Sequence, residues 1–150
     1  MVFREVPITR LFFLIGGIQA KSRRLAERAI RPFGLTYSQY GVLVALGEND
    51  GLPQKAVAER LETDANTVMV IVDSLETKAL VARLCSPSDK RLRLVTLTDA
   101  GRSALLAANA AVEPLYRGLA DMFTEAEIAA AEAPLGRLYQ ILKSEEATKP

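Results

Sequence analysis

Three charged residues, Asp89, Lys90 and Arg91, separate two stretches rich in valine and leucine, residues 80–85 and 92–97. Extended apolar stretches joined by a turn that contains proline and serine are typical of a β-hairpin. Ammonium and guanidinium groups at a hairpin end can bind phosphates and enter a minor groove, where the potential is negative. We therefore interpret this hairpin end as a candidate contact with nucleic acid.

Two predicted helices stand directly before the hairpin. The first covers residues 53–61, with Pro53 in its first turn. The second begins after Asp64, a good N-cap residue, and ends near Lys78. Two helices joined by a tight turn and followed by a charged hairpin form a winged helix-turn-helix. The second helix can then lie in a major groove while the hairpin contacts an adjacent minor groove.

The chain before this unit also has a helical pattern. Apolar residues recur at steps of three and four over residues 5–33, which predicts a long helix. Gly16 and Gly17 interrupt the pattern, so either the helix bends there or another backbone comes close. Another helix is predicted to begin after Thr36, which forms a capping box with Gln39.

Two more helices are predicted after the hairpin, over residues 99–143. The apolar residues of the first recur in a coiled-coil-like seam that requires a partner helix. The second starts with a capping box at Thr124, and Pro114 and Pro134 are expected to kink the helices that contain them. The seam predicts a dimer, and the alternative is packing of three helices within one chain.

The predicted fold is mainly α with a small β wing. A winged helix-turn-helix lobe covers residues 35–98, and the flanking segments 5–33 and 99–143 are predicted dimerisation helices. No linker or repeat divides the chain, so one domain over residues 1–150 is expected.

The composition excludes several classes of protein. The 150 residues are 49% hydrophobic and 25% charged, with a net charge of +1, which is typical of a globular protein. There is no histidine and a single cysteine, Cys85, so we predict no catalytic site, metal site, cofactor or disulfide. No apolar run is long enough for a membrane span, and we expect a cytoplasmic protein without a membrane partner. Residues 11–18 could mimic a secretory signal, but Glu5 precedes them and the helical pattern continues beyond them.

From residue 35 to residue 102 the chain resembles the MarR family of bacterial regulators. The hairpin and its junction with the next helix are the most specific part of the match. The matching segments are residues 54–61, residues 66–68 with the pairs 72–73 and 75–76, and residues 89–91 followed by Val95, Leu97, Thr98 and Gly101.

The resemblance implies a homodimeric transcriptional regulator, more often a repressor than an activator, that binds double-stranded DNA at a pseudo-palindromic operator. It also implies that Arg91 and Lys90 enter or border the minor groove, with Asp89 orienting the arginine.

The predicted recognition helix departs from the family because residues 64–77 contain no lysine or arginine. Asn66 and Thr67 are then the candidate base readers, with methyl contacts from Ala65, Met69 or Val70. Asparagine can pair with adenine and apolar groups contact the thymine methyl, so we expect a half-site rich in A·T. Phosphate contacts would carry more of the affinity, and the candidates for them are Lys55, Lys78, Arg83 and Arg93.

Ala79 stands where the family usually has glycine. Alanine is strained at that position if the backbone there is left-handed.

Many regulators of this family bind small aromatic or lipophilic acids between their dimer helices and their DNA-binding lobe. The residues of this chain predicted to line such a cleft are Arg10, Phe12, Phe13, Ile15, Arg23, Tyr37, Tyr40 and Tyr116. Aromatic residues at helical spacing also occur in an ordinary core, which is the alternative interpretation.

One alternative to a DNA-binding regulator is an enzyme. With no histidine and a single cysteine, the residues of this chain assemble no catalytic site. A second alternative is a dimeric interaction module with the same fold that does not bind DNA. The absence of lysine and arginine from the predicted recognition helix is the feature that favours it.

Overall fold

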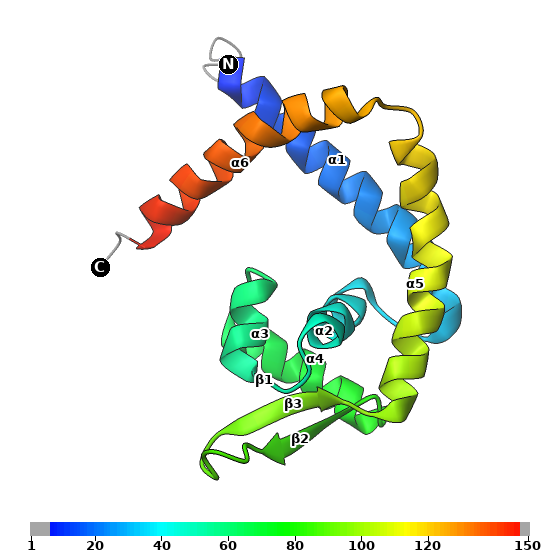
Figure 1. Cartoon of the computed structure of the whole chain (residues 1–150), viewed down its shortest axis with the longest axis vertical. Helices are drawn as coiled ribbons and strands as arrows, with labels where there is room; N and C mark the ends of the chain where they lie inside the picture. Colours follow the sequence, from blue (N-terminus) through cyan, green and yellow to red (C-terminus); the bar gives the residue numbers. More distant parts are fainter. Residues whose placement is uncertain (1–6, 148–150) are drawn as a thin grey trace. The chain divides into compact units, whose positions relative to one another are not determined.

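The computed structural model describes residues 7–147 and confirms a mainly helical fold with a small antiparallel sheet (Figure 1). The elements are α1 (Pro7–Ile30), η2 (Arg31–Phe33), α2 (Tyr37–Glu48), β1 (Leu52–Pro53), α3 (Gln54–Arg60), α4 (Ala65–Thr77), β2 (Val81–Cys85), β3 (Arg93–Leu97), α5 (Asp99–Ala120) and α6 (Glu125–Ala147). Positions 5 and 6 of the predicted first helix lie outside the described residues.

The chain divides into two compact units, Met1–Glu113 and Pro114–Pro150. The first contains the winged lobe and its core. Side chains from α2, α3, α4, the sheet and the first half of α5 form this core, and the fully buried ones include Leu43, Leu46, Val57, Val68, Val72, Leu75 and Val95. Burial of such side chains stabilises the lobe by about 1.5–3 kcal/mol each.

The helix-turn-helix has the predicted local signals at its helix starts. Thr36 accepts a hydrogen bond from the amide of Gln39 (3.2 Å), and the Gln39 side chain accepts one from the amide of Thr36 (3.1 Å). The predicted capping box is therefore confirmed. Asp64 caps α4 in the same way, through the amide of Thr67 (2.9 Å).

The hairpin formed by β2 and β3, which we call the wing, is also confirmed. In the sheet β3 lies between β1 and β2, and Val81 pairs with Leu97 while Cys85 pairs with Arg93. The sequence did not predict β1. Its two residues pair with β3, and Pro53 also serves as the N-cap of α3 rather than as a residue of its first turn.

The turn between α4 and the wing has the left-handed residue that the sequence suggested. Ala79 has φ +57°, so the left-handed backbone that would strain an alanine is present at this position.

Helix α1 continues without interruption through Gly16 and Gly17, and a Cβ atom at either glycine would meet nothing within 4 Å. Only Ala26 and Ile30 of α1 are buried.

In the second unit, α6 begins with the predicted capping box. The carboxylate of Glu127 accepts hydrogen bonds from the amide and hydroxyl of Thr124, and these hydrogen bonds lower the pKa of Glu127. Pro134 lies inside α6, and Pro114, the first residue of this unit, lies inside α5. None of the described α6 side chains is buried.

Within residues 7–147, no helix is both long enough and apolar enough to cross a membrane. In the same range, no group of acidic and cysteine side chains is arranged to hold a metal ion.

Candidate nucleic-acid interface

Helix α4 turns the side chains predicted to read bases away from the core. Val68, Val72 and Leu75 are fully buried on one side of the helix. On the other side the predicted contacts are exposed, with Met69 at 44% and Val70 at 64% of their full surface. The remaining predicted contacts on this helix, Ala65, Asn66 and Thr67, are exposed as well.

The start of α4 uses part of the hydrogen-bonding capacity of Thr67. Its hydroxyl donates to the carboxylate of Asp64 (2.5 Å), which also accepts from the Thr67 amide. Both hydrogen bonds favour the ionised carboxylate and lower the pKa of Asp64. Since the Thr67 hydroxyl proton is engaged in the cap, this residue can offer a base only its acceptor lone pairs.

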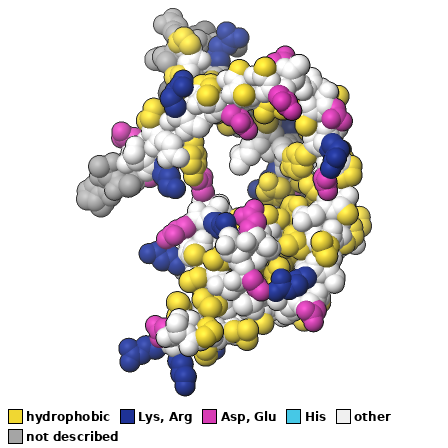
Figure 2. Space-filling model, in the orientation of Figure 1, with side chains coloured by type: hydrophobic (Ala, Val, Ile, Leu, Met, Phe, Trp, Pro, Cys, Tyr) yellow, Lys and Arg dark blue, Asp and Glu magenta, His cyan; other side chains and the backbone are white. Residues whose placement is uncertain are grey.

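The wing carries the predicted cations at its end. Lys90, Arg91 and Arg93 are exposed, and Figure 2 shows Lys and Arg side chains projecting from this part of the molecule. A carboxylate oxygen of Asp89 accepts a hydrogen bond from the backbone amide of Arg91 (2.9 Å). The amide of Leu92 donates to the carbonyl oxygen of Asp89 (3.0 Å). Asp89 thus fixes the backbone of the turn from which Arg91 projects.

Arg83 differs from the exposed cation that the sequence suggested. Its guanidinium lies between two carboxylates of α4, 2.6 Å from an oxygen of Asp73 and 2.5 Å from an oxygen of Glu76. One of its Nη atoms also donates to the side-chain oxygen of Gln54 on α3 (3.3 Å). Partial burial opposes the charge, but these hydrogen bonds to the carboxylates outweigh it and raise the pKa of Arg83.

Lys78 is likewise engaged within the protein. Its Nζ donates to the carbonyl oxygen of Gly34 (2.6 Å) and to the side-chain oxygen of Gln39 (2.9 Å). The same Gln39 side chain donates to the hydroxyl of Ser74 (2.9 Å). Ser74 therefore joins α4 to α2.

Lys55 lies on α3 with 86% of its side chain exposed, and its Nζ is 3.9 Å from the carboxylate of Glu59. An exposed pair of this length is worth about 0–1 kcal/mol, so the lysine remains available to a phosphate.

The predicted ligand residues are only partly brought together. Tyr37 and Tyr40 line a groove of about 530 Å³ in the first unit. The other residues that line it are Gln19, Gly41, Val44, Ala45, Glu48, Arg60, Leu61 and Glu62. Arg23 lies beside this region, with its guanidinium 5.3 Å from the centre of the Tyr37 ring.

The other predicted ligand residues lie outside the groove. Phe12 and Phe13 are exposed on the N-terminal half of α1, together with Arg10 and the half-buried Ile15. Tyr116 belongs to the second unit.

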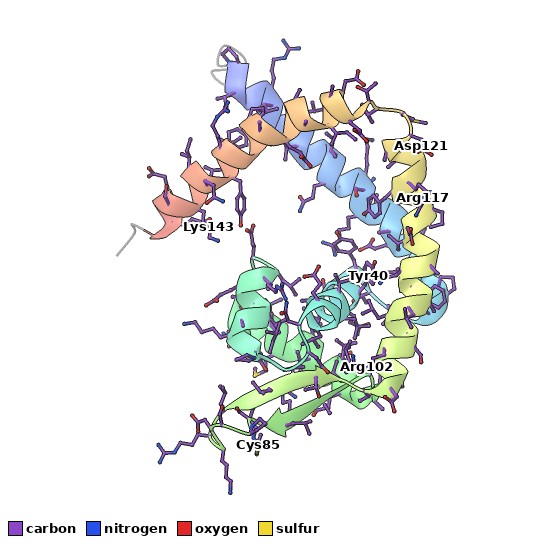
Figure 3. All side chains as sticks on the ribbon, viewed as in Figure 1. Tyr40, Cys85, Arg102, Arg117, Asp121 and Lys143 are labelled. Carbon is purple, nitrogen blue, oxygen red and sulfur yellow. The ribbon has the colours of Figure 1, made fainter. Side chains whose placement is uncertain are left out.

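Internal contacts of Tyr40 and Arg60 shape the groove. The hydroxyl of Tyr40 on α2 donates to the side-chain oxygen of Asn109 on α5 (2.7 Å). Figure 3 labels Tyr40 in the region between α2 and α5. Arg60 donates to the carbonyl oxygen of Ala45 (3.2 Å) and pairs with Glu48 (3.1 Å). A ligand in the groove would meet an aromatic side and a charged side.

The sequence did not identify the partners of Arg83. Asp73 and Glu76 are three residues apart, so both lie on the side of α4 that faces the wing. This spacing was the one sequence signal that could have identified them as partners of a cation on the wing. Gln54, which also donates to the carbonyl oxygen of Ala65 (3.3 Å), gave no separate signal.

The comparisons with known proteins agree with this geometry. A family model described as the MarR family matches residues 33–92. The chain is 31% identical over 129 residues to a putative transcriptional regulatory protein for the hcr operon from Thauera aromatica, and the match covers 86% of this chain and 78% of the relative.

Two solved structures are similar over most of their length. A mutant of MarR from E. coli complexed with operator DNA has a TM-score of 0.81 and 28% identity, covering 92% of this chain and 98% of that one. CouR from Rhodococcus jostii RHA1, bound to p-coumaroyl-CoA, has a TM-score of 0.79 and 27% identity, covering 85% of this chain and 90% of that one.

Proposed function

Because the chain belongs to the MarR family of transcriptional regulators, we propose that it is a repressor that binds a pseudo-palindromic operator as a homodimer. We further propose that a small aromatic or acidic effector releases it from DNA. The family consists of regulators rather than enzymes. The observation that carries the proposal is the joint exposure of the wing cations and of the outer face of α4 on one winged lobe.

The wing supplies the electrostatic part of the interface. Arg91 is exposed on a turn whose backbone Asp89 fixes, so its guanidinium can reach into a narrow minor groove. Lys90, Arg93 and Lys55 are exposed and can contact phosphates, which gives affinity without sequence preference.

Helix α4 supplies the sequence preference. The amide of Asn66 suits adenine, and Ala65, Met69 and Val70 offer apolar contact to thymine methyl groups. With the Thr67 hydroxyl engaged in the helix cap, Asn66 becomes the main hydrogen-bonding reader. An operator half-site rich in A·T follows from this set of side chains.

Apolar surface on α6 supports the dimer. Ile128, Leu135, Tyr139, Ile141 and Leu142 are all at least 38% exposed in one chain. Figure 2 shows apolar side chains along the exposed surface of this helix. A soluble helix with no buried side chain needs another surface to pack on, and a second copy can supply it.

A charge on α6 tests the dimer. We expect the wild type to sediment as a dimer and Leu142→Glu to shift the population toward monomer. Leu84→Glu is the matched control, because Leu84 is similarly exposed but lies on the wing. A monomeric wild type, or an equal effect of both variants, would contradict the proposal.

The groove beside Tyr37 and Tyr40 supports the effector. Its volume of about 530 Å³ is within the usual range for small-molecule sites. Arg23 lies over the ring of Tyr37 and forms an exposed ion pair with Glu27 (2.9 Å), which an acidic group of the effector would replace. The remaining candidates, Arg10, Phe12, Phe13, Ile15 and Tyr116, do not line this groove, and their role in ligand binding stays a prediction from the sequence. The effector would act by favouring a dimer in which the two wings no longer match the half-sites.

The DNA-binding proposal is tested with a duplex that covers the region upstream of the gene and with a scrambled duplex of equal composition. Affinity for each is measured as salt rises, for the wild type, Arg91→Ala and Arg24→Ala. Loss of a groove contact predicts weaker binding by Arg91→Ala and a salt slope smaller by about one. Arg24, exposed on α1, is the matched control and is expected to leave both quantities nearly unchanged.

A wild type with no preference for the upstream duplex and no salt dependence would contradict DNA binding. If such a protein is still dimeric, the result favours the alternative function, a dimeric interaction module. The exposed carboxylates and the absence of cations on α4 are the observations behind that alternative.

A further inference from the structure

The outward face of α4 carries two carboxylates of its own, those of Asp73 and Glu76. Asn66, Val70 and Asp73 follow one another at steps of four and three residues, so the Asp73 carboxylate shares the face of the proposed base readers. Glu76 stands one turn beyond Val72 on the side toward the wing, and the helix has no lysine or arginine. Left alone, these two carboxylates would repel the phosphates on either side of a major groove.

Arg83 is the cation that offsets them, and it comes from β2 rather than from the helix. Its Nη2 lies 2.6 Å from Asp73 and its Nη1 lies 2.5 Å from Glu76. The backbone amide of Arg83 also donates to Glu76 (3.3 Å). The guanidinium therefore bridges two carboxylates with two different nitrogens, a geometry that a lysine cannot reproduce.

The arginine is less exposed than its partners. Its side chain keeps 23% of its surface, against 58% for Asp73 and 41% for Glu76. Gln54 closes the arrangement by accepting from the same Nη2 (3.3 Å) and by donating to the carbonyl oxygen of Ala65. The network thus joins β2, α3 and the first turn of α4 around one guanidinium.

A phosphate could recruit this guanidinium only by competing with two carboxylates already bound to it. Charge-assisted hydrogen bonds of this kind are about twice as strong as neutral ones. The exchange would also leave Asp73 and Glu76 without a counter-charge beside the DNA. A direct phosphate contact is therefore the less favourable role for Arg83.

We propose that Arg83 is a positioning residue for DNA binding that acts through Asp73 and Glu76. It neutralises the acidic face of α4 and fixes the angle between the wing and α4, so that both enter adjacent grooves together. This inference rests on the DNA-binding function proposed above. It replaces the phosphate contact that the sequence suggested for this residue.

The test combines Arg83→Met, which keeps the aliphatic stem, with the double amide variant Asp73→Asn/Glu76→Gln. Affinity for the upstream duplex is measured over a range of salt, and thermal unfolding is followed for each protein. We expect Arg83→Met to weaken binding by about tenfold or more, because it leaves two carboxylates facing phosphates. Added salt screens this repulsion, so the deficit of Arg83→Met should shrink as salt rises and its salt slope should be lower than that of the wild type.

The amide pair is then added to Arg83→Met. If Arg83 acts through the carboxylates, the triple variant binds within about threefold of the wild type and recovers the wild-type salt slope. The matched control adds the same amide pair to Arg91→Ala, whose wing contact does not involve Asp73 or Glu76. A smaller rescue of Arg91→Ala shows that the recovery is specific to Arg83 and is not a general effect of net charge.

Three outcomes overturn the inference. In the first, Arg83→Met lowers the salt slope by about one, and the triple variant keeps the lower slope, which identifies a phosphate contact. In the second, the amide pair rescues Arg91→Ala as strongly as Arg83→Met. In the third, Arg83→Met binds like the wild type.

If Arg83→Met does not fold, Arg83→Lys answers the same question. A lysine keeps the charge but not the two-armed bridge, so a positioning role predicts weaker binding that the amide pair restores. A phosphate contact predicts that Arg83→Lys binds like the wild type, with or without the amide pair. Absence of binding by the wild type is a different result, because it contradicts the proposed function itself.

Discussion

The hydroxyl of Thr98 donates a hydrogen bond to the carbonyl oxygen of Ala79 over 2.7 Å and so closes the base of the wing. The same hydroxyl accepts from the amide of Gly101 (3.0 Å), which caps the start of α5. The backbone of Leu80, next to Ala79, accepts from the amide of Thr98 (3.1 Å). One side chain therefore holds together the end of the α4 turn, the end of β3 and the first turn of α5.

Replacement of Ala79 by glycine is expected to stabilise the protein. The left-handed backbone at φ +57° strains alanine, and glycine removes most of that strain, for a net gain of about 1 kcal/mol. Chemical unfolding of the two proteins measures the difference. The matched control is Ala110→Gly in the exposed surface of α5, where the same change should cost about 1 kcal/mol. Equal signs for the two variants would show that Ala79 is not strained.

A methyl group at Gly101 is expected to be poorly tolerated. A Cβ atom there would lie 1.9 Å from the carbonyl oxygen of Leu80, which is backbone and cannot rotate away. We expect Gly101→Ala to lower the free energy of unfolding by about 3 kcal/mol, or to prevent folding. The control is Gly118→Ala in the same helix, where a Cβ atom meets nothing within 4 Å. A Gly101→Ala protein as stable as this control would mean that the close approach to Leu80 is not present.

The cap of α4 predicts a dependence of stability on pH. Hydrogen bonds from the hydroxyl and the amide of Thr67 lower the pKa of Asp64 below its ordinary value of 3.8. Because the folded-state pKa is the lower one, the carboxylate stabilises the protein fully above the unfolded-state pKa. This contribution is lost as the pH falls through the folded-state pKa.

Asparagine caps helices well but does not titrate in this range. The wild type is therefore expected to be more stable than Asp64→Asn at neutral pH, and the difference should shrink as the pH falls from about 5 to about 2. Urea unfolding at a series of pH values measures it. A difference that stays constant across that range would show that Asp64 does not stabilise the fold through its charge.

The buried side chain of Gln39 predicts a loss of stability when it becomes apolar. Gln39 is 6% exposed, and its side chain serves Thr36, Ser74 and Lys78 at once. Gln39→Leu removes all three hydrogen bonds and should cost about 2 kcal/mol or more. Gln39→Glu keeps the two accepted hydrogen bonds, and the Ser74 hydroxyl can donate to the new carboxylate, so a smaller cost is expected in thermal unfolding. An equal cost for both variants would point to side-chain packing as the cause.

The sequence predicted the features that depend on neighbouring residues. Thr36 with Gln39 and Asp64 with Thr67 are helix starts set within four residues, and the wing follows from two apolar stretches around a polar turn. Family resemblance then supplied the position of Arg91. These signals are local, so tertiary packing did not need to be known.

The features that the sequence missed depend on residues far apart in the chain. Strand β1 has two residues, and only its pairing with β3 gives it an extended conformation. Arg83 and Lys78 looked like free cations because their partners stand on other elements. A cation's role depends on its nearest carboxylate or carbonyl group, and composition does not locate that group.

Thr98 is the only residue between the end of β3 at Leu97 and the start of α5 at Asp99. An inserted or deleted residue at this junction would turn α5 by about 100° around its axis relative to the sheet. The helix would then present a different set of side chains to the core that now contains Leu105 and Ala108. At the opposite end of the wing, the exposed turn around Lys90 can accommodate an inserted residue. The two ends of the hairpin therefore differ in how well they tolerate a change in chain length.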